Sequence, residues 1–73
     1  MNKKDEIRLI EECMDLNQGT LHEDRSLVDF EEWDSLTILS IISVVDEKYH
    51  KILTGDEMKK VRTVSDLLKL IDK

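Results

Sequence analysis

The chain of 73 residues has no proline, two glycines and one cysteine, and these scarcities narrow what it can be. The single cysteine, Cys13, excludes an intramolecular disulfide. His22 and His50 lie far apart, and no cysteines and histidines have the spacing of zinc ligands. No apolar run approaches the ~20 residues that a membrane-spanning helix needs. We therefore expect no metal site and no membrane span, so that one small apolar core must hold the fold together.

Other common signals are also weak. The opening stretch MNKKDEIRLIEE turns acidic at once and lacks the apolar segment of a secretory signal peptide. A lone cysteine agrees with a reducing compartment, so we expect a cytoplasmic protein. The length predicts a single domain over residues 1–73. No segment alternates apolar and polar residues over a strand's length, which argues against a sheet.

Negative charge is concentrated in the first half of the chain. Residues 1–34 hold eleven acidic and four basic side chains, whereas residues 35–73 hold six acidic and seven basic ones. The net charge of −6 argues against a nucleic-acid partner, because phosphate binding needs clustered Lys and Arg. The acidic side chains are densest shortly before residue 35, at Glu23, Asp24, Asp29, Glu31, Glu32 and Asp34. They form either a solvated loop or a negative field that steers basic proteins.

Helical periodicity predicts a first helix from Lys4 to Leu16. Its apolar stripe comprises Ile7, Leu9, Ile10, Cys13, Met14 and Leu16, so we expect Cys13 to belong to the core. Asn17, Gln18 and Gly19 then offer a stop. Residues 18–34 follow as a long connection, which is unusual in a small domain and often functional. We expect it to be fastened to the core by Leu27, Val28 and Phe30.

A second helix is predicted from Ser35 to Tyr49 or His50, and either Asp34 or Ser35 can cap it. Its apolar face is expected to comprise Ile38, Leu39, Ile41, Ile42, Val45 and Tyr49. Its polar face is expected to comprise Thr37, Ser40, Ser43, Glu47 and Lys48. Val44 lies within that polar face, where burial in the core does not explain it.

Two shorter patterns complete the chain. Thr54 and Glu57 have the spacing of a capping box and open a short helix with Met58 and Val61 as its apolar residues. A similar start at Thr63 opens the last helix, whose apolar positions are Val64, Leu67, Leu68 and Ile71. The predicted fold is all-α, a small four-helix bundle with three longer helices, a short third helix and a long loop between the first two.

Ser35 allows two interpretations. It can be a plain helix cap, since serine is common at that position. Alternatively, the free amides and partial positive charge of a helix N-terminus would stabilise a phosphate carried on Ser35, beside the apolar face that begins at Ile38. No base or oxyanion site is visible around Ser35, which argues against an enzyme.

The tripeptide Asp34-Ser35-Leu36, which opens an apolar helix near the middle of a small acidic four-helix chain, resembles the motif of acyl carrier proteins. The resemblance covers nearly the whole chain in helix order. It implies that a phosphopantetheinyl transferase attaches 4'-phosphopantetheine from coenzyme A to Ser35, with Asp34 and Leu36 as motif neighbours. The thiol of this arm would carry acyl groups as thioesters between acyl-loading and acyl-transferring enzymes. A monomer would suit such a shuttle.

Several positions differ from carriers of fatty acid biosynthesis. Thr37 and Ser40 stand where acidic side chains are common, and Ser43 stands where an apolar partner contact is typical. Trp33 stands where a small residue is common, and it either fastens the loop to the bundle or contacts partners or the arm. These differences favour a carrier for a specialised biosynthetic pathway.

Partner docking is predicted along one strip, comprising Leu36, Thr37, Ser40 and Val44, with Glu31 and Glu32 steering basic partners. The fold cannot separate a fatty acyl carrier from aminoacyl, peptidyl or D-alanyl carriers, which share the architecture. A further alternative is a helical interaction module that carries nothing. Such a module would tolerate alanine at Ser35, whereas a carrier would not.

Overall fold

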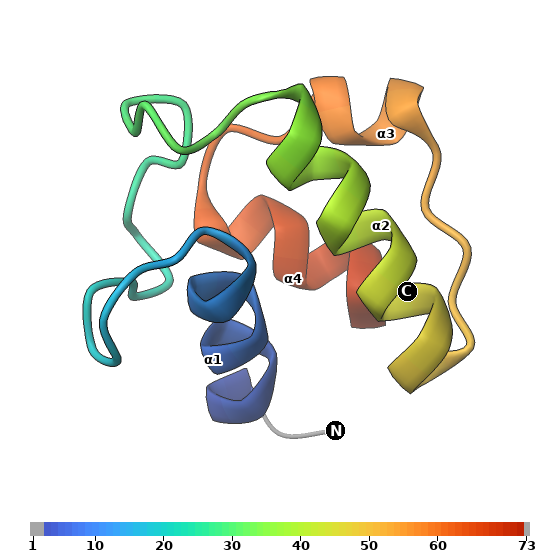
Figure 1. Cartoon of the computed structure of the whole chain (residues 1–73), viewed down its shortest axis with the longest axis horizontal. Helices are drawn as coiled ribbons and strands as arrows, with labels where there is room; N and C mark the ends of the chain where they lie inside the picture. Colours follow the sequence, from blue (N-terminus) through green and yellow to red (C-terminus); the bar gives the residue numbers. More distant parts are fainter. Residues whose placement is uncertain (1–2, 73) are drawn as a thin grey trace.

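The computed structural model describes residues 3–72, and that range folds into four helices (Figure 1). They are α1 (Lys3–Cys13), α2 (Ser35–Tyr49), α3 (Gly55–Lys59) and α4 (Val64–Asp72). Within the same range there is no strand, only an isolated bridge between Ser26 and Thr63. The predicted all-α fold, with a short third helix and a long loop before α2, is confirmed.

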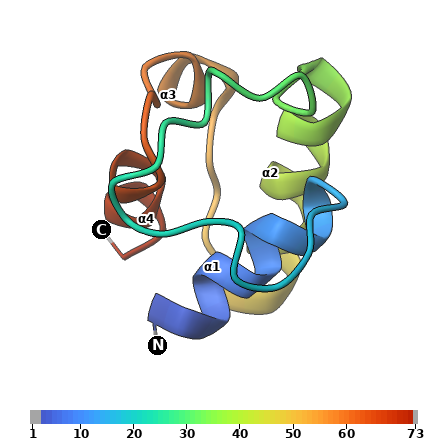
Figure 2. The same ribbon diagram turned by 90° about the vertical axis from the view of Figure 1, so that its left-hand side faces the viewer.

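One apolar core takes side chains from all four helices and from the connections between them. α1 packs against α2 and α4, and α2 packs against α3. Figure 2 shows the long loop running across the open side of the helices, so that it closes the core there. The buried apolar side chains are Leu9, Ile10, Met14, Leu21, Leu27, Ile41, Val45, Leu53, Met58, Val61, Val64, Leu67, Leu68 and Ile71. The predicted apolar face of α4 is therefore buried in full.

α1 ends three residues earlier than its apolar stripe predicts. The helix stops at Cys13, and Asp15 adopts a left-handed conformation with φ 58°. The Asp15 N–H donates to the Glu12 carbonyl at 3.1 Å, and the Leu16 N–H donates to the Glu11 carbonyl at 2.8 Å. These two bonds form a Schellman motif, which closes a helix and satisfies its last carbonyls. The predicted end was too late because Met14 and Leu16, which follow the helix, still pack in the core and continue the apolar stripe.

The buried face of α2 is narrower than predicted. Ile41 and Val45 are fully buried, but Leu39 is 61% exposed, so its expected place on the core face is wrong. Leu39 is two residues from Ile41 and therefore lies about 200° around the helix from it. Val44, expected to lie outside the core, is half-buried and packs against it. Val44 is three positions after Ile41 and therefore lies about 60° from it around the helix.

The N-terminal turns of α3 and α4 use reciprocal caps, as predicted. Thr54 Oγ1 accepts from the Glu57 N–H at 3.1 Å, and Glu57 Oε1 accepts from the Thr54 N–H at 3.1 Å. At α4, Thr63 Oγ1 accepts from the Asp66 N–H, and Asp66 Oδ2 accepts from the Thr63 N–H. The Arg62 N–H also donates to Asp66 Oδ2, at 3.1 Å. This bond, followed by the one from the Thr63 N–H, stabilises the ionised carboxyl and lowers the pKa of Asp66.

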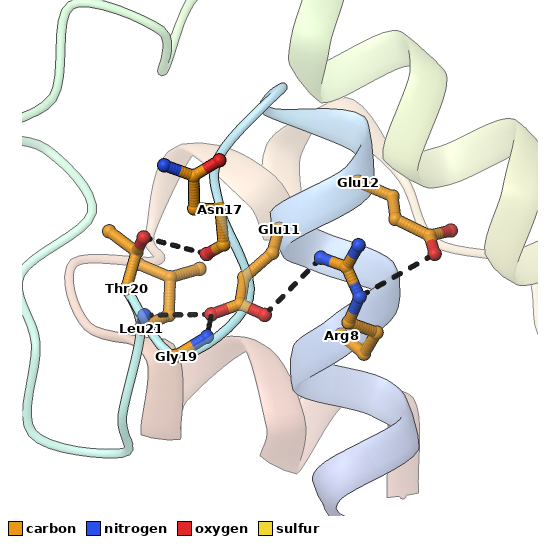
Figure 3. Close-up of polar contacts among 7 residues, drawn as sticks. All are labelled: Arg8, Glu11, Glu12, Asn17, Gly19, Thr20 and Leu21. Carbon is orange, nitrogen blue, oxygen red and sulfur yellow. Dashed lines mark hydrogen bonds and ion pairs between the residues drawn. The ribbon is translucent and has the colours of Figure 1, made fainter.

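A buried carboxylate fastens the first part of the long loop to α1 (Figure 3). Glu11 is 2% exposed, and its Oε2 accepts from the Gly19 N–H at 3.0 Å and from the Leu21 N–H at 2.9 Å. Its Oε1 lies 3.6 Å from Arg8 Nη1. A charge can be buried here because it is both hydrogen-bonded and paired. The loop is therefore held in place by a residue on α1.

The second part of the loop pairs with the segment that precedes α4. The Leu27 N–H donates to the Arg62 carbonyl at 2.8 Å, and the Val64 N–H donates to the Arg25 carbonyl at 3.0 Å. Leu27 is fully buried, as predicted, whereas Val28 is 51% exposed and does not fasten the loop. These contacts hold the middle of the loop against the segment that precedes α4.

Glu6 is a second buried carboxylate, on the face of α1 that turns toward the end of α4. It is fully buried, and neither of its carboxylate oxygens has a hydrogen-bond partner within residues 3–72. Burial, reinforced by the nearby Asp72 carboxyl, raises the pKa of Glu6 to about 7. Lys3 opposes this rise. Burial also raises the pKa of Tyr49 on α2, with Glu6 contributing.

We predict that the fold loses stability as the pH rises from about 4.5 through about 7. Over this interval the folded chain keeps the Glu6 proton while the unfolded chain releases it, so ionisation favours unfolding. The expected decrease in the free energy of unfolding is on the order of 1–3 kcal/mol, measured by urea denaturation across this pH range. Glu6→Gln should remove this part of the slope, whereas Glu12→Gln, on the exposed face of the same helix, should retain it. A Glu6→Gln chain with an unchanged slope would contradict the prediction.

Candidate functional site

Asp34 is the residue that caps α2. Its backbone is extended (φ −124°, ψ 179°), and its Oδ1 accepts from the Thr37 N–H at 2.9 Å. Its carbonyl accepts from the Ile38 N–H at 2.9 Å, which is the first bond of the helix. The sequence left Asp34 and Ser35 open as caps, and the structure assigns the role to Asp34. Ser35 is the first residue inside the helix, so capping does not explain it.

The Ser35 side chain is exposed, and its hydroxyl makes no hydrogen bond with any residue from 3 to 72. In the same range the backbone N–H groups of Ser35 and Leu36 also have no acceptor. Free amides at the first turn of a helix carry a partial positive charge and can donate to an anion. Ser35 therefore combines a free hydroxyl with donors that can hold negatively charged oxygens close to it.

A groove opens beside Ser35 between α2 and α3, which lie next to each other in Figure 1. Its volume is about 310 Å³, and it is lined by Ser35, Ile38, Leu39, Ile42, Gly55, Met58 and Lys59. Met58 is buried, whereas Leu39 is 61% exposed, so apolar surface extends from the core out to solvent. The exposure of Leu39, which contradicted the expected core packing, gives the groove an apolar wall.

A larger hollow, of about 460 Å³, lies elsewhere, between α1 and α2. Its lining is mostly charged and comprises Asp5, Arg8, Leu9, Glu12, Lys48 and Tyr49. None of these residues belongs to the first turn of α2, so this hollow is separate from Ser35. The smaller groove is the better candidate because an apolar lining meets a free hydroxyl there.

The predicted docking strip is only partly exposed. Leu36 is 77% exposed and Ser40 is exposed, whereas Thr37 and Val44 are half-buried. Glu31 and Glu32 are both exposed in the turn that precedes Asp34. The start of α2 thus presents an exposed leucine directly after Ser35 and exposed acidic side chains shortly before it.

Trp33 and Phe30 fasten this acidic turn to the bundle. Both are half-buried and pack against the core, and the Trp33 N–H donates to the Phe30 carbonyl at 3.1 Å. This placement agrees with the interpretation of Trp33 as an anchor for the loop. The anchored turn fixes where Asp34 and Ser35 lie.

Cys13 has the character expected of a core residue. It is half-buried and packs against the core, and burial, followed by the charge of Glu12, raises the pKa of its thiol. A raised pKa lowers the fraction of reactive thiolate. Among residues 3–72, no three His, Cys, Asp or Glu side chains are grouped so that they could hold a metal ion. No helix in the described range has the length and apolar character needed to cross a membrane.

Lys59 is a groove residue that the sequence reasoning did not single out. It lines the groove from α3, facing the side formed by α2. The sequence could have indicated this position, because Met58 was expected to be an apolar residue of the short helix. The next residue lies about 100° around the helix, at the edge of the apolar face. What the sequence could not show is that this edge lies next to Ser35.

The chain has the fold of acyl carrier proteins. No protein-family profile and no curated protein matches the sequence. A solution NMR structure of the holo acyl carrier protein from Geobacter metallireducens is 26% identical, with a TM-score of 0.76 over 99% of this chain and 84% of that one. A protein from Mycobacterium tuberculosis assigned as an acyl carrier protein is 18% identical, with a TM-score of 0.79 over 97% of this chain and 96% of that one, a likeness of fold. The predicted resemblance is therefore confirmed for the fold and for an acyl-carrier-like domain.

We predict that Asp34→Ala and Ser35→Ala differ in their effect on stability. Removing the cap should lower the free energy of unfolding by about 1 kcal/mol. Removing the unpaired Ser35 hydroxyl should change it by less than about 0.5 kcal/mol. Urea denaturation of the two variants beside the parent chain measures both values. The assignment of the cap would be wrong if Ser35→Ala were the more damaging change.

Proposed function

We propose that this chain is a carrier protein, not an enzyme, and that it holds acyl groups as thioesters on a 4'-phosphopantetheine arm attached to Ser35. One observation carries the proposal. The Ser35 hydroxyl is exposed, is not needed as a cap, and lies at an apolar groove in a fold shared with acyl carrier proteins.

The residues at the start of α2 suit such an arm. The Ser35 hydroxyl is free to form a phosphate ester, and the amides of Ser35 and Leu36 are free to donate to the phosphate oxygens. Asp34 would hold this turn in shape, because its carboxylate is already engaged with Thr37. When attached, the arm would supply a terminal thiol that forms thioesters. The apolar groove would offer the arm or its acyl group a surface shielded from water.

The attachment step needs a separate enzyme. The Ser35 oxygen would form a bond to the phosphorus next to the pantetheine of coenzyme A. The bond from that phosphorus to the adenosine-containing half would break, and the hydroxyl proton would pass to a base on the transferase. The described residues that line the groove include no histidine or carboxylate that could take this proton. A phosphopantetheinyl transferase is therefore the first proposed partner.

The surface around Ser35 favours a specialised biosynthetic pathway over fatty acid biosynthesis. The exposed part of α2 just after Ser35 carries no acidic side chain until Asp46, so partners that bind an acidic second helix would gain little here. Leu36, Thr37, Ser40 and Val44 are the proposed docking contacts for the acyl-loading and acyl-transferring enzymes. A monomer suits a carrier that visits several enzymes in turn, and its cytoplasmic location stays a prediction.

The nature of the cargo is a separate part of the proposal. The groove of about 310 Å³ is open to solvent along the exposed Leu39 and does not form an enclosed cavity. An acyl group lying there would be only partly covered, which favours short or polar cargo over a long fatty chain. Aminoacyl, peptidyl and D-alanyl carriers share this fold, and their cargo is likewise short or polar.

We predict that the purified chain gains the mass of one phosphopantetheine when it is incubated with coenzyme A and a broad-specificity transferase. Ser35→Ala should gain nothing. Ser40→Ala, a serine on the same helix, should gain the same mass as the parent chain. Intact mass spectrometry measures all three, and fragmentation of the labelled peptide locates the arm.

The outcomes separate the proposed carrier from its alternative. A chain that remains folded, as judged by circular dichroism, but gains no mass with several transferases would be an interaction module without a cargo. A gain that survives Ser35→Ala would place the arm on another residue. Either result would overturn the proposal.

We also predict that Glu31 and Glu32 accelerate loading of Ser35. Both are exposed beside Asp34, so they can attract a basic partner enzyme before contact. Glu31→Gln combined with Glu32→Gln should slow loading about two- to fivefold at low salt and less at high salt. The matched control is Asp5→Asn combined with Glu12→Gln, which removes the same charge from α1. Equal rates for the two double variants would contradict steering by the acidic turn.

A further inference from the structure

We propose that Lys59 positions the arm by pairing with the phosphate on Ser35, so that the arm is held over the groove between α2 and α3. This inference rests on the proposed function and assigns a role within the same site. It concerns a positioning residue, since Lys59 would act on the arm and not on the thioester.

Ser35 and Lys59 contribute to the same groove from different helices. Ser35 belongs to the first turn of α2, and Lys59 is the last residue of α3. Lys59 is the one charged residue among the described residues that line this groove. It is exposed, and its side chain has no ion pair or hydrogen bond with any residue from 3 to 72. Its ammonium is therefore free to pair with an anion that arrives at Ser35.

The direction of Lys59 follows from how α3 is built. The reciprocal cap of Thr54 and Glu57 fixes where the helix begins, and Met58 is buried with 1% exposure. The residue after Met58 lies about 100° around the helix, which places Lys59 at the edge of the groove. Lys60 lies about 200° from Met58 and lines a different hollow, together with Asp66 and Lys69. The chain thus offers a neighbouring lysine of the same charge that does not line the groove.

The size and surroundings of the groove favour the pairing. Both residues line one groove of about 310 Å³, so a phosphate on Ser35 would enter the space that Lys59 faces. A lysine can lay its apolar stem along the groove while its ammonium stays in water. Glu31, Glu32 and Asp34 precede Ser35, are exposed and do not line the groove, and their charges would repel the phosphate.

This distribution of charge gives the arm a direction. Repulsion from the acidic turn and attraction to Lys59 both favour an arm that leaves Ser35 across the groove. An arm on this course meets apolar surface, which is supplied by Ile38, Leu39, Ile42 and Met58. Lys59 would thereby increase the time that the arm or its cargo spends against the groove.

Lysine labelling of the 73-residue chain tests the inference, with Lys60 as an internal control. Intact mass first establishes that the arm is on Ser35, and an amine-selective reagent is then applied to the loaded and unloaded chains. We expect loading to slow the labelling of Lys59 about two- to fivefold, the range that an exposed ion pair gives, and to leave Lys60 unchanged. The protection should disappear in about 1 M salt.

The phosphorus NMR signal of the loaded chain provides a second readout. Lys59→Met should shift this signal and remove its dependence on salt. Lys59→Arg and Lys60→Met should each keep both the position of the signal and its dependence on salt. Circular dichroism establishes that the variants keep their helices. The inference is overturned if loading slows the labelling of Lys59 no more than that of Lys60. It is also overturned if Lys59→Met leaves the phosphorus signal in place. A chain that gains no mass overturns the proposed function and this inference with it.

Discussion

The hydrogen bond from the Thr37 N–H to the Asp34 carboxylate fixes where α2 begins, and the arrangement of the site depends on it. Because Asp34 is the cap, Ser35 enters the helix with its hydroxyl unpaired and its backbone N–H free. In a helix that began one residue later, Ser35 would be the cap and its hydroxyl would accept a backbone N–H. The cap at Asp34 therefore leaves the Ser35 hydroxyl free.

The position of this cap depends in turn on the long loop. Glu11 holds the beginning of the loop, and Leu27 anchors its middle through a buried side chain and a backbone bond to Arg62. Trp33 then packs against the core directly before Asp34. The loop can therefore stay highly acidic and exposed along much of its length while its end is held in place. Such a division suits the role proposed for the loop, which is to position Ser35 and to attract partners.

The sequence predicted those features that depend on local periodicity or on a short motif. α4 has a complete apolar face, and the caps at Thr54 and Thr63 follow from residues three positions apart. The faces and caps could be predicted because each can be read within one turn or one element of the chain. Ser35 was proposed from the motif Asp34-Ser35-Leu36 and the order of the helices, and its role stays a prediction.

The predictions that were wrong, and the residues that were missed, depend on which elements pack against one another in the folded chain. The end of α1 was placed too late because Leu16 continues the apolar stripe after Asp15 has already closed the helix. Leu39 was assigned to the core because the apolar positions of α2 suggest a wide buried face, whereas only Ile41 and Val45 are fully buried. The roles of Glu11 and Lys59 require partners on other elements, and neither pairing can be read from spacing along the chain.

The central claim is that an arm on Ser35 lies in the groove between α2 and α3, and amide NMR spectra of the loaded and unloaded chains test it most directly. The account predicts the largest shifts at Ser35 and Leu36 and, on the opposite wall, at Met58 and Lys59 of α3, with little change in α1. Shifts at Ser35 and Leu36 alone would mean that the arm leaves the surface and does not occupy the groove. Shifts concentrated at the hollow between α1 and α2 would contradict the account by placing the arm in another part of the molecule.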